Sequence, residues 1–474
     1  MTATTLPAII QGGMGVGVSS WRLAGAVARA GQLGVVSGVA LDTILIRRLQ
    51  LGDPDGSVRR ALGAFPARQA AEQILDRYFV GGGIPPGSAF AVVPRLSLRQ
   101  RPESVALIVA ANFVEVFLAK EGHSGSIGIN YLEKIQMATP ASALGAMLAG
   151  VDYVLMGAGI PSEIPRLLDG LASGVPTSIR VDVEGASTEA SYRVGVDPGI
   201  FTGTRTAIKR PRFLAVIAAH RLGQFLARDP LTCPDGFVVE TPVAGGHSAP
   251  PRGRAVLDEH GQPVYGERDL VDPAAMTRLG LPFWLAGGYG TPSGLVAAQE
   301  VGAVGVQVGS AFALCRESGI DEGLREELLR RALQGHLQVR NDPRASPTGF
   351  PFKVAELPGT VADPQVAAGR RRVCDLGYLR VPYEKPGGAV GYRCAGEPIG
   401  VFVRKGGRHE DAEDRQCLCN GLLATVGLAQ RRPRGYVEPP IVTIGQELSF
   451  LGELTAHGSE YGASDVVSYL LSGA

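Results

Sequence analysis

One histidine stands directly after a pair of glycines in the segment GFVVETPVAGGHSAPPRG, which covers residues 236–253. His247 comes just beyond a predicted strand, Phe237–Glu240, and Gly246 immediately precedes it. A neutral imidazole here can accept a proton from a carbon acid, and glycines let a cofactor and a substrate approach the backbone closely. A histidine that caps a turn or binds a buried carbonyl would have the same surroundings. The catalytic role of His247 is therefore a hypothesis.

Two further glycine turns lie close together in PFWLAGGYGTPSGLVAAQEVGAVGVQVGSAF, residues 282–312. Gly287 and Gly288 follow one predicted strand, and Gly309 and Ser310 follow the next. Backbone N–H groups at such turns, beside a helix N-terminus, can bind a phosphate dianion. The pattern is typical of the last two βα units of a phosphate-binding barrel. It predicts FMN, whose single phosphate needs no Rossmann loop, and a barrel without ligand is the alternative.

A third glycine turn occurs near the N-terminus in PAIIQGGMGVGVSSWRLAGAVARAGQLGVVSG, residues 7–38, before a helix expected to begin near Ser19. Met14 interrupts the G-x-G-x-x-G frame of a dinucleotide-binding loop, and no acidic residue ends the second strand. The whole stretch instead resembles the opening of the nitronate monooxygenase and flavin-dependent enoyl reductase superfamily. That resemblance implies that Gly12, Gly13 and Met14 line the isoalloxazine ring of a flavin.

The position of His247 is also similar to that of a Gly-Gly-His motif in nitronate monooxygenases, near the reactive edge of the flavin. The resemblance implies that His247 deprotonates or positions a nitroalkane-type substrate. FMN would take the electrons, and O₂ or another acceptor would reoxidise it. The continuation SAPPRG departs from the His-Arg-Gly that commonly follows, which leaves the substrate open. A flavin-dependent enoyl reductase or NAD(P)H:acceptor reductase of fatty-acid or polyketide type and a non-catalytic flavin-binding scaffold are the alternatives.

Two residues in the middle of the chain are further candidates for the flavin site. Lys134 follows the predicted strand Ile127–Tyr131, where its charge could stabilise an anionic reduced flavin or bind a phosphate. An ordinary surface lysine fits the sequence equally well. Gly157 ends the predicted strand Tyr153–Met156 and could approach the flavin or the substrate.

Four of the six cysteines lie in the last quarter of the chain, at Cys374, Cys394, Cys417 and Cys419, with 19, 22 and 1 residues between them. This spacing is not the pair of C-x-x-C motifs of a zinc ribbon. Four thiolates can nevertheless hold Zn²⁺ or an iron–sulfur cluster. Buried free thiols are the alternative, since cysteine is among the most buried residue types.

Strands and helices must alternate to position these residues, and up to about residue 345 they are predicted to do so. We therefore expect an α/β fold, a (β/α)8 TIM barrel that binds FMN over residues 1–345, and a smaller cysteine-bearing α+β domain over residues 346–474. Ten apolar runs are candidate strands, more than a barrel needs: Ala8–Gln11, Leu33–Ser37, Phe90–Val93, Phe113–Leu118, Ile127–Tyr131, Tyr153–Met156, Phe213–Ala218, Phe237–Glu240, Phe283–Leu285 and Gly305–Val308.

Two long polar segments, Ser187–Arg212 and Arg252–Asp272, exceed the usual connection length of about 2–6 residues. They are predicted to be insertions that act as lids or substrate loops.

The overall composition favours a small-molecule partner. The 474 residues carry a net charge of +1, which provides no basic field for nucleic acid or an anionic membrane. The first residues show no positive region followed by an apolar one, and no run of about 18 apolar residues occurs. These features predict a cytoplasmic protein, and a homodimer is one assembly that they allow.

Overall fold

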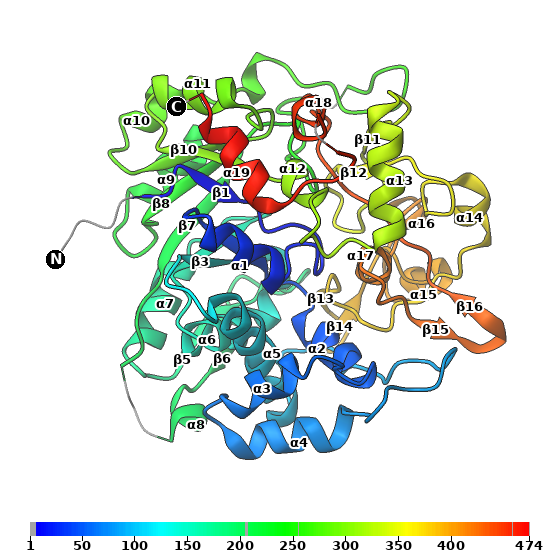
Figure 1. Ribbon diagram of the computed structural model, residues 1–474. Coiled ribbons are helices and arrows are strands. Elements are labelled where there is room, and N and C mark those ends of the chain that lie inside the picture. Colours follow the sequence, from blue (N-terminus) through cyan, green and yellow to red (C-terminus); the bar gives the residue numbers. More distant parts are fainter. Residues whose placement is uncertain (1–5, 204–206, 255, 457, 474) are drawn as a thin grey trace.

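A closed barrel of eight parallel strands forms the centre of the computed structural model, which describes residues 6–203, 207–254, 256–456 and 458–473 (Figure 1). The strands follow one another around the barrel in the order β1-β10-β9-β8-β7-β4-β3-β2. Closure occurs between β1 and β2, where the Gln11 N–H donates to Leu33 O at 2.9 Å and the Leu33 N–H donates to Ile9 O at 3.1 Å. The predicted (β/α)8 barrel is thus confirmed. Its strands are β1 (Ile9–Gln11), β2 (Gly34–Ser37), β3 (Ile127–Leu132), β4 (Tyr153–Gly157), β7 (Arg212–Ile217), β8 (Gly236–Glu240), β9 (Phe283–Ala286) and β10 (Gly305–Val308).

Two of the ten predicted strands are wrong. Phe90–Val93 lies in an irregular segment, and Phe113–Leu118 belongs to helix α5 (Pro102–Lys120). A continuous apolar run does not distinguish a buried strand from a buried helix. Helix α5 packs against α1 (Trp21–Arg29), α2 (Leu41–Gln50) and α6 (Thr139–Leu148), so it is apolar on nearly every side. By length and composition alone α5 could cross a membrane, but most of it is buried inside this protein.

The barrel interior is filled by one set of alternate side chains from the strands. Val238 in β8 and Trp284 in β9 belong to this inner cluster, together with Ile10, Val35, Tyr153, Leu155, Leu214, Leu33 and Ala286. Phe237 and Val239, one residue away from Val238, belong instead to the core between strands and helices. Because strand side chains alternate, Glu240 has the same inward parity as Val238 and lies at the carboxyl end of β8.

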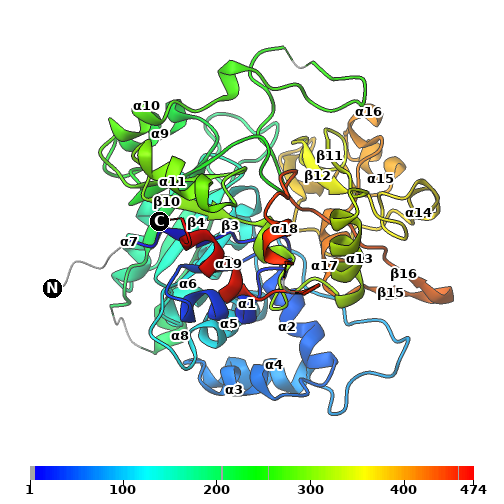
Figure 2. The same ribbon diagram turned by 45° about the horizontal axis from the view of Figure 1, so that its top comes forward.

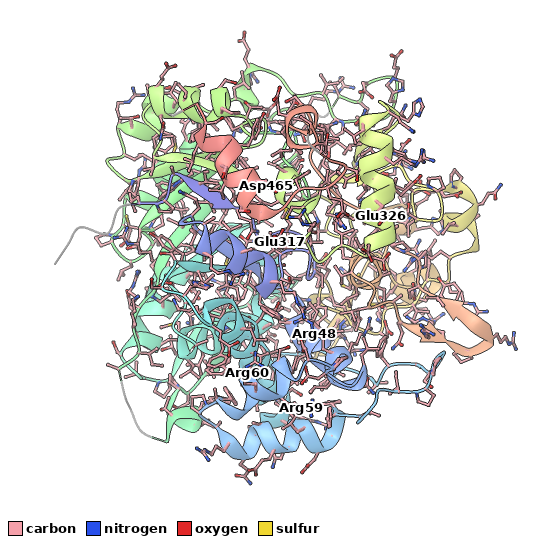
Figure 3. All side chains as sticks on the ribbon, viewed as in Figure 1. Arg48, Arg59, Arg60, Glu317, Glu326 and Asp465 are labelled. Atoms are coloured by element: carbon pink, nitrogen blue, oxygen red, sulfur yellow. The ribbon has the colours of Figure 1, made fainter. Side chains whose placement is uncertain are left out.

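A ring of helices surrounds the barrel, and the last helix of the chain completes it. Helix α19 (Ala463–Leu471) packs against both α1 and α11 (Pro292–Glu300), as Figures 1 and 2 show. Two carboxylates cap the N-terminus of α19. Glu317 accepts a hydrogen bond from the Ala463 N–H at 2.9 Å, and Asp465 accepts one from the Gly462 N–H at 2.7 Å (Figure 3). The remaining ring helices are α5, α6, α7 (Ile164–Ala172), α9 (His220–Ala227) and α10 (Pro273–Thr277).

Insertions and most of the C-terminal residues other than α19 lie outside this ring. One predicted long loop, Ser187–Arg212, contains strand β6 (Arg193–Val196), which forms a hairpin with β5 (Thr177–Arg180) and is followed by α8 (Gly199–Thr202). Its residues 204–206 lie outside the described residues. The insertion after β2 contains α3 (Ser57–Gly63) and α4 (Arg68–Tyr78) in addition to α2.

The C-terminal residues lie beside the barrel in Figures 1 and 2. Strands β11 (Val339–Asp342) and β12 (Phe352–Ala355) pair across the domain boundary predicted at residue 345, so the boundary stays a prediction. The other elements here are α12 (Ser310–Ala313), α13 (Glu322–Leu333), α14 (Pro364–Gly369), β13 (Val381–Glu384), β14 (Val390–Arg393), α15 (Ile399–Arg404), α16 (His409–Ala412), α17 (Leu418–Thr425), β15 (Arg431–Arg432), β16 (Tyr436–Val437) and α18 (Leu451–Leu454).

Barrel closure leaves no room for a side chain at Gly305 of β10. A Cβ there would stand 1.9 Å from the Ala8 carbonyl oxygen on the chain leading into β1. We predict that Gly305→Ala destabilises the fold by at least about 2 kcal/mol, because backbone atoms on both strands must move apart. The midpoint of urea unfolding measures this. Gly63→Ala is the control, since Gly63 ends α3 with nothing within 4 Å of an added Cβ, and an unfolding midpoint equal for both variants would contradict the prediction.

Candidate active site

The turn after β1 is held from inside by two buried polar side chains. Gln11 donates from Nε2 to Ser19 Oγ at 2.8 Å and accepts the Val35 N–H on Oε1 at 3.0 Å. Ser19 Oγ in turn accepts the Met14 N–H at 2.9 Å and donates to Gly12 O at 2.9 Å. These bonds satisfy the backbone groups of a turn that leaves the sheet, so the predicted flavin-lining glycines have a defined conformation.

The β1 turn meets the ends of two other strands at the rim of the barrel. A Cβ on Gly13 would stand 2.3 Å from Cβ of Asn130 in β3, so only glycine fits there. The position of a Cβ on Gly309, after β10, is 3.4 Å from Met14 Sδ. The structure therefore brings together Gly12, Gly13 and Met14 with the predicted phosphate-binding turn at Gly309.

The two predicted phosphate-binding turns lie side by side because β9 and β10 are paired. Gly287 and Gly288 have φ of +83° and +81°, a left-handed conformation that favours glycine. Among the described residues, the backbone N–H groups of Gly288 and Gly309 have no hydrogen-bond partner. Ser310 Oγ accepts the Gly445 N–H at 2.8 Å, so its hydroxyl is partly engaged by the C-terminal part of the chain.

The segment of residues 441–446 crosses over the loop that carries the histidine. Thr443 Oγ1 accepts the Gly246 N–H at 3.0 Å, and Val243 O accepts the Gln446 N–H at 3.3 Å. A Cβ on Gly245 would stand 2.9 Å from the Gly445 nitrogen, which explains the glycine before Gly246. The loop after β8 is thus positioned by residues about 200 positions further along the chain.

His247 is held against residues 346–352. Its Nε2 lies 2.7 Å from Ser346 Oγ, and its ring meets the ring of Phe352 edge-on with centroids 4.8 Å apart. Burial and, to a smaller extent, the nearby charge of Lys134 lower the pKa of His247 to about 4. The imidazole is therefore neutral at pH 7, as predicted, but it is a weak base. Ser346 was not singled out from the sequence, because no local pattern relates it to His247.

Lys134 lies in the 3-10 helix Glu133–Ala138 that follows β3. Its Nζ is 4.3 Å from the centroid of the Phe350 ring, so the structure places its charge on the same segment that holds His247. Gly157 ends β4, and an added Cβ would stand 2.9 Å from Cβ of Val216 in β7. This close packing is a structural reason for that glycine, and its contact with a cofactor stays a prediction.

Two ionisable residues that the sequence did not reveal, half-buried Glu240 and fully buried Lys353, lie near His247. Burial raises the pKa of Glu240 to about 7, opposed by the charge of Lys353. Burial also lowers the pKa of Lys353 to about 8, and Glu240 opposes that shift. Lys353 Nζ donates to Pro242 O at 2.6 Å and to Ser248 Oγ at 2.8 Å. From the sequence, Glu240 was identified only as the end of a predicted strand. Lys353, which lies in β12, was not singled out.

A cavity at the carboxyl ends of β7 and β8 contains both Glu240 and His247. Arg252, Tyr265 and Asp269 line its other side, and all three belong to the segment Arg252–Asp272 that was predicted to be a lid or substrate loop. Its residue 255 lies outside the described residues. Residues that could bind, polarise or deprotonate a small molecule therefore share one cavity at the barrel rim.

The four C-terminal cysteines lie apart from this cavity. Cys394, Cys417 and Cys419 are buried, and Cys374 is half-buried. Within the described ranges, no three or more His, Cys, Asp or Glu side chains are arranged as a group that could hold a metal ion. Neither the zinc ion nor the iron–sulfur cluster predicted at these cysteines is therefore supported by the described residues.

Comparisons with known proteins match the part of the chain that contains this cavity. Residues 205–341 match the family model described as nitronate monooxygenase. A nitronate monooxygenase of Pseudomonas aeruginosa is 40% identical over 130 residues, 26% of this chain and 35% of that protein. One of Paraburkholderia phytofirmans is 37% identical over 103 residues, 21% of this chain and 25% of that protein. The alignments therefore span well under two thirds of these relatives.

The fold also has solved counterparts. The structure of FabK from Thermotoga maritima superposes with a TM-score of 0.50 and 16% sequence identity, covering 99% of this chain and 93% of that chain. At this identity the likeness concerns the fold alone. It supports the barrel fold, and the superposition also includes the residues outside the barrel.

The raised pKa of Glu240 predicts a pH-dependent stability. Because its pKa rises from 4.5 to about 7 on folding, its contribution is fully present below pH 4.5 and is lost as the pH rises through about 7. We expect the free energy of unfolding of the wild type to fall by about 1–3 kcal/mol relative to Glu240→Gln between pH 4.5 and 7.5. Urea unfolding of both proteins across this range measures the difference. Parallel pH profiles would show that Glu240 titrates normally.

Proposed function

Starting from the nitronate monooxygenase family domain that residues 205–341 of this chain contain, we propose that the protein is an FMN-dependent oxidoreductase that oxidises alkyl nitronates with O₂. The observation that carries the proposal is the meeting of three glycine turns, after β1, β9 and β10, at the barrel rim that also bears His247. Ligands of β/α barrels bind at the carboxyl ends of the strands, which is where all these residues lie.

The described residues fit an FMN molecule. The unpartnered N–H groups of Gly288 and Gly309 are donors for its phosphate, and positive φ at Gly287 turns the backbone toward the ligand. Gly12, Gly13 and Met14 would hold the ring system, since the β1 turn that carries them lies at the barrel rim beside the turn at Gly309. FMN, when bound, supplies the two-electron acceptor that no side chain of the protein provides.

The pKa values of His247 and Glu240 suggest a division of roles. A nitronate is the anion of a nitroalkane that has already lost its α-proton, so binding it requires a hydrogen-bond donor or a cation rather than a base. Neutral His247, with Lys134 nearby, suits that task. A neutral nitroalkane must first lose the proton, and a general base works best with a pKa near the working pH. Glu240, with a pKa of about 7, is the better base for that step.

Replacing His247 separates an enzyme from a non-catalytic flavin-binding scaffold. We predict that His247→Ala lowers kcat/KM for an alkyl nitronate about 100-fold while FMN remains bound, because only the substrate loses a partner. Steady-state oxygen uptake and the visible flavin spectrum provide the two readouts. His336→Ala is the matched control, since His336 is exposed and far from the cavity in sequence. Equal activity of the His247→Ala variant and the wild type would refute a role in turnover.

The choice of electron donor tests the reaction itself. In anaerobic stopped-flow experiments the proposal requires the flavin to bleach rapidly with an alkyl nitronate. Rapid bleaching by NADH or NADPH with no response to nitronates would instead identify the reductase alternative.

The phosphate site has its own test. A Cβ on Gly309 would make an ordinary contact, 3.4 Å from Met14 Sδ, and the φ of −108° suits any residue, so the backbone tolerates substitution there. We predict that Gly309→Asp weakens FMN binding about 100-fold through charge repulsion, while riboflavin, which lacks the phosphate, binds with nearly unchanged affinity. Gly309→Asn is the neutral control of equal size. Flavin fluorescence titration of the deflavinated protein measures all four affinities, and equal weakening by both variants would place the phosphate elsewhere.

A further inference from the structure

The hairpin formed by β11 and β12 holds the backbone of the loop that carries His247. The Ser248 N–H donates to Pro351 O at 2.9 Å, and the Lys353 N–H donates to Gly246 O at 2.9 Å. His247 lies between these two bonds, as in a short antiparallel pairing with β12. The histidine is therefore fixed by a strand that lies outside the barrel.

The side chain of Lys353 ties the two ends of the same loop together. Its Nζ donates to Pro242 O at 2.6 Å and to Ser248 Oγ at 2.8 Å, and its third ammonium proton has no hydrogen-bond partner among the described residues. Pro242 and Ser248 line the cavity, whereas Lys353 is fully buried behind them. One cation thus bridges the residues on either side of the turn that presents His247.

A buried ammonium group is a costly way to make these two hydrogen bonds. A neutral amide can make both, and a cation removed from water is stable only when a negative group lies near it. Glu240 lies two residues before Pro242, at the carboxyl end of β8. Burial raises the pKa of Glu240, and the charge of Lys353 opposes that rise. The lysine therefore acts on the acid as well as on the loop of the histidine.

The other charges around the cavity do not replace that of Lys353. Besides Glu240, the ionisable residues that line the cavity are His247, Arg252, Tyr265 and Asp269. Lys134, on the 3-10 helix after β3, acts on His247. Among the described residues, the charge that acts on Glu240 is that of Lys353. Substituting Lys353 therefore changes the electrostatics of this acid and leaves the other charges in place.

Strand β11 connects the same hairpin to the segment Arg252–Asp272. Asn341 is the partner of Lys353 in the register of the two strands. Its N–H donates to Gln262 Oε1 at 2.8 Å, and its side-chain amide donates to Tyr265 OH at 3.2 Å. The hairpin thus supports two walls of the cavity, one through Lys353 and the other through Asn341.

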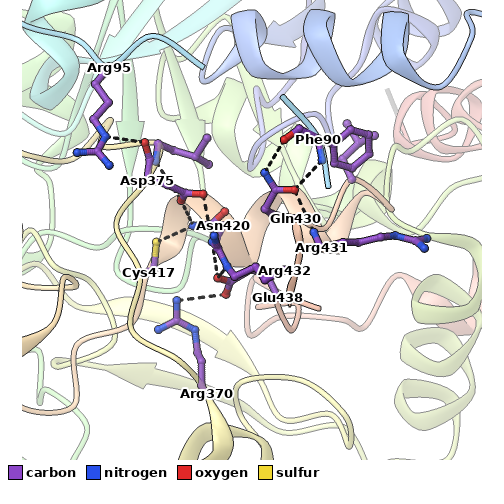
Figure 4. Close-up of polar contacts among 12 residues, drawn as sticks. Phe90, Arg95, Arg370, Asp375, Cys417, Asn420, Gln430, Arg431, Arg432 and Glu438 are labelled. Carbon is purple, nitrogen blue, oxygen red and sulfur yellow. Dashed lines mark hydrogen bonds and ion pairs between the residues drawn. The ribbon is translucent and has the colours of Figure 1, made fainter. Parts of the chain in front are cut away.

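The far end of β12 is fixed by a segment with a buried anchor. The Ala355 N–H donates to Val442 O at 2.9 Å. Shortly before this segment, the carboxylate of Glu438 is fully buried between Arg432 at 2.7 Å and Arg370 at 3.5 Å (Figure 4). A strand held on both sides gives the ammonium group of Lys353 a defined position.

We propose that Lys353 is a positioning residue of the active site, which fixes the loop of residues 242–248 that carries His247 and places a positive charge behind Glu240. It acts from behind the cavity wall, because Pro242 and Ser248 lie between it and the cavity. Its effect on turnover rests on the function proposed above, whereas its effect on Glu240 does not.

Lys353→Met tests the positioning of the loop, because methionine keeps an unbranched, apolar side chain and removes the charge. We expect kcat/KM for an alkyl nitronate to fall about 30-fold with FMN affinity unchanged, since a small displacement of an active-site group is enough for such a loss. Combining Lys353→Met with His247→Ala should cost no more than His247→Ala alone, because the lysine acts through the histidine.

Lys385→Met, which changes an exposed lysine, is the matched control and should be as active as the wild type. Losses that multiply in the double variant would show that Lys353 has only a general structural role. Either that result or a fully active Lys353→Met variant would overturn the proposal.

The pH dependence of unfolding tests the charge without any turnover. The difference in unfolding free energy between the wild type and Glu240→Gln should level off above the folded-state pKa of Glu240, about 7. In the Lys353→Met background we expect it to level off about one pH unit higher, because a carboxylate that loses a nearby cation binds its proton more tightly. Levelling off at the same pH in both backgrounds would contradict the proposed charge effect.

Ser248→Ala is the milder variant if Lys353→Met fails to fold. It removes one of the two bonds and keeps the charge, so kcat/KM for the nitronate should fall about 5-fold. Full activity of Ser248→Ala would then overturn the positioning role. A shifted levelling-off pH without nitronate turnover by the wild type would support the role of Lys353 and refute the proposed function. Nitronate turnover that neither substitution affects would do the reverse.

Discussion

The closure of the barrel between β1 and β2 is the constraint on which the rest of the structure depends. Two backbone hydrogen bonds join these strands, and the chain must pass so close to itself that Gly305 has no room for a side chain. Once the eight strands are parallel and closed, all their carboxyl ends lie on one rim. Residues nearly 300 positions apart, such as Gly13 and Gly309, then become neighbours through Met14. The candidate site is a consequence of that geometry.

The chemistry of the rim is set by partial burial. Removing His247 from water lowers its pKa to about 4, whereas the same effect raises the pKa of Glu240 to about 7. Desolvation always disfavours the charged form, so a base and an acid in one cavity shift in opposite directions and both move toward neutrality. A histidine that donates or accepts hydrogen bonds and a carboxyl group that exchanges a proton near pH 7 are the result.

The C-terminal residues form part of this site. Ser346 Oγ is within hydrogen-bonding distance of His247, and Lys353 of β12 provides a positive charge near Glu240. Thr443 accepts a hydrogen bond from the N–H of Gly246, the glycine before the histidine. Helix α19 returns to the barrel between α1 and α11, and α17 ends against the β1 turn. The residues beyond the barrel therefore position the rim loops.

The sequence by itself indicated the eight barrel strands among ten candidates, because each is a short apolar run bounded by turn residues. It also indicated the glycine turns, because left-handed backbone and close approach require glycine. It could not exclude Phe113–Leu118 as a strand, since an apolar run buried on all sides looks alike in a helix and in a strand. Only the tertiary structure decided that Glu240, Ser346 and Lys353 belong with His247. Such contacts join strands and loops that are distant along the chain. No local pattern records which distant segment will supply the partner or how deeply the pair will be buried.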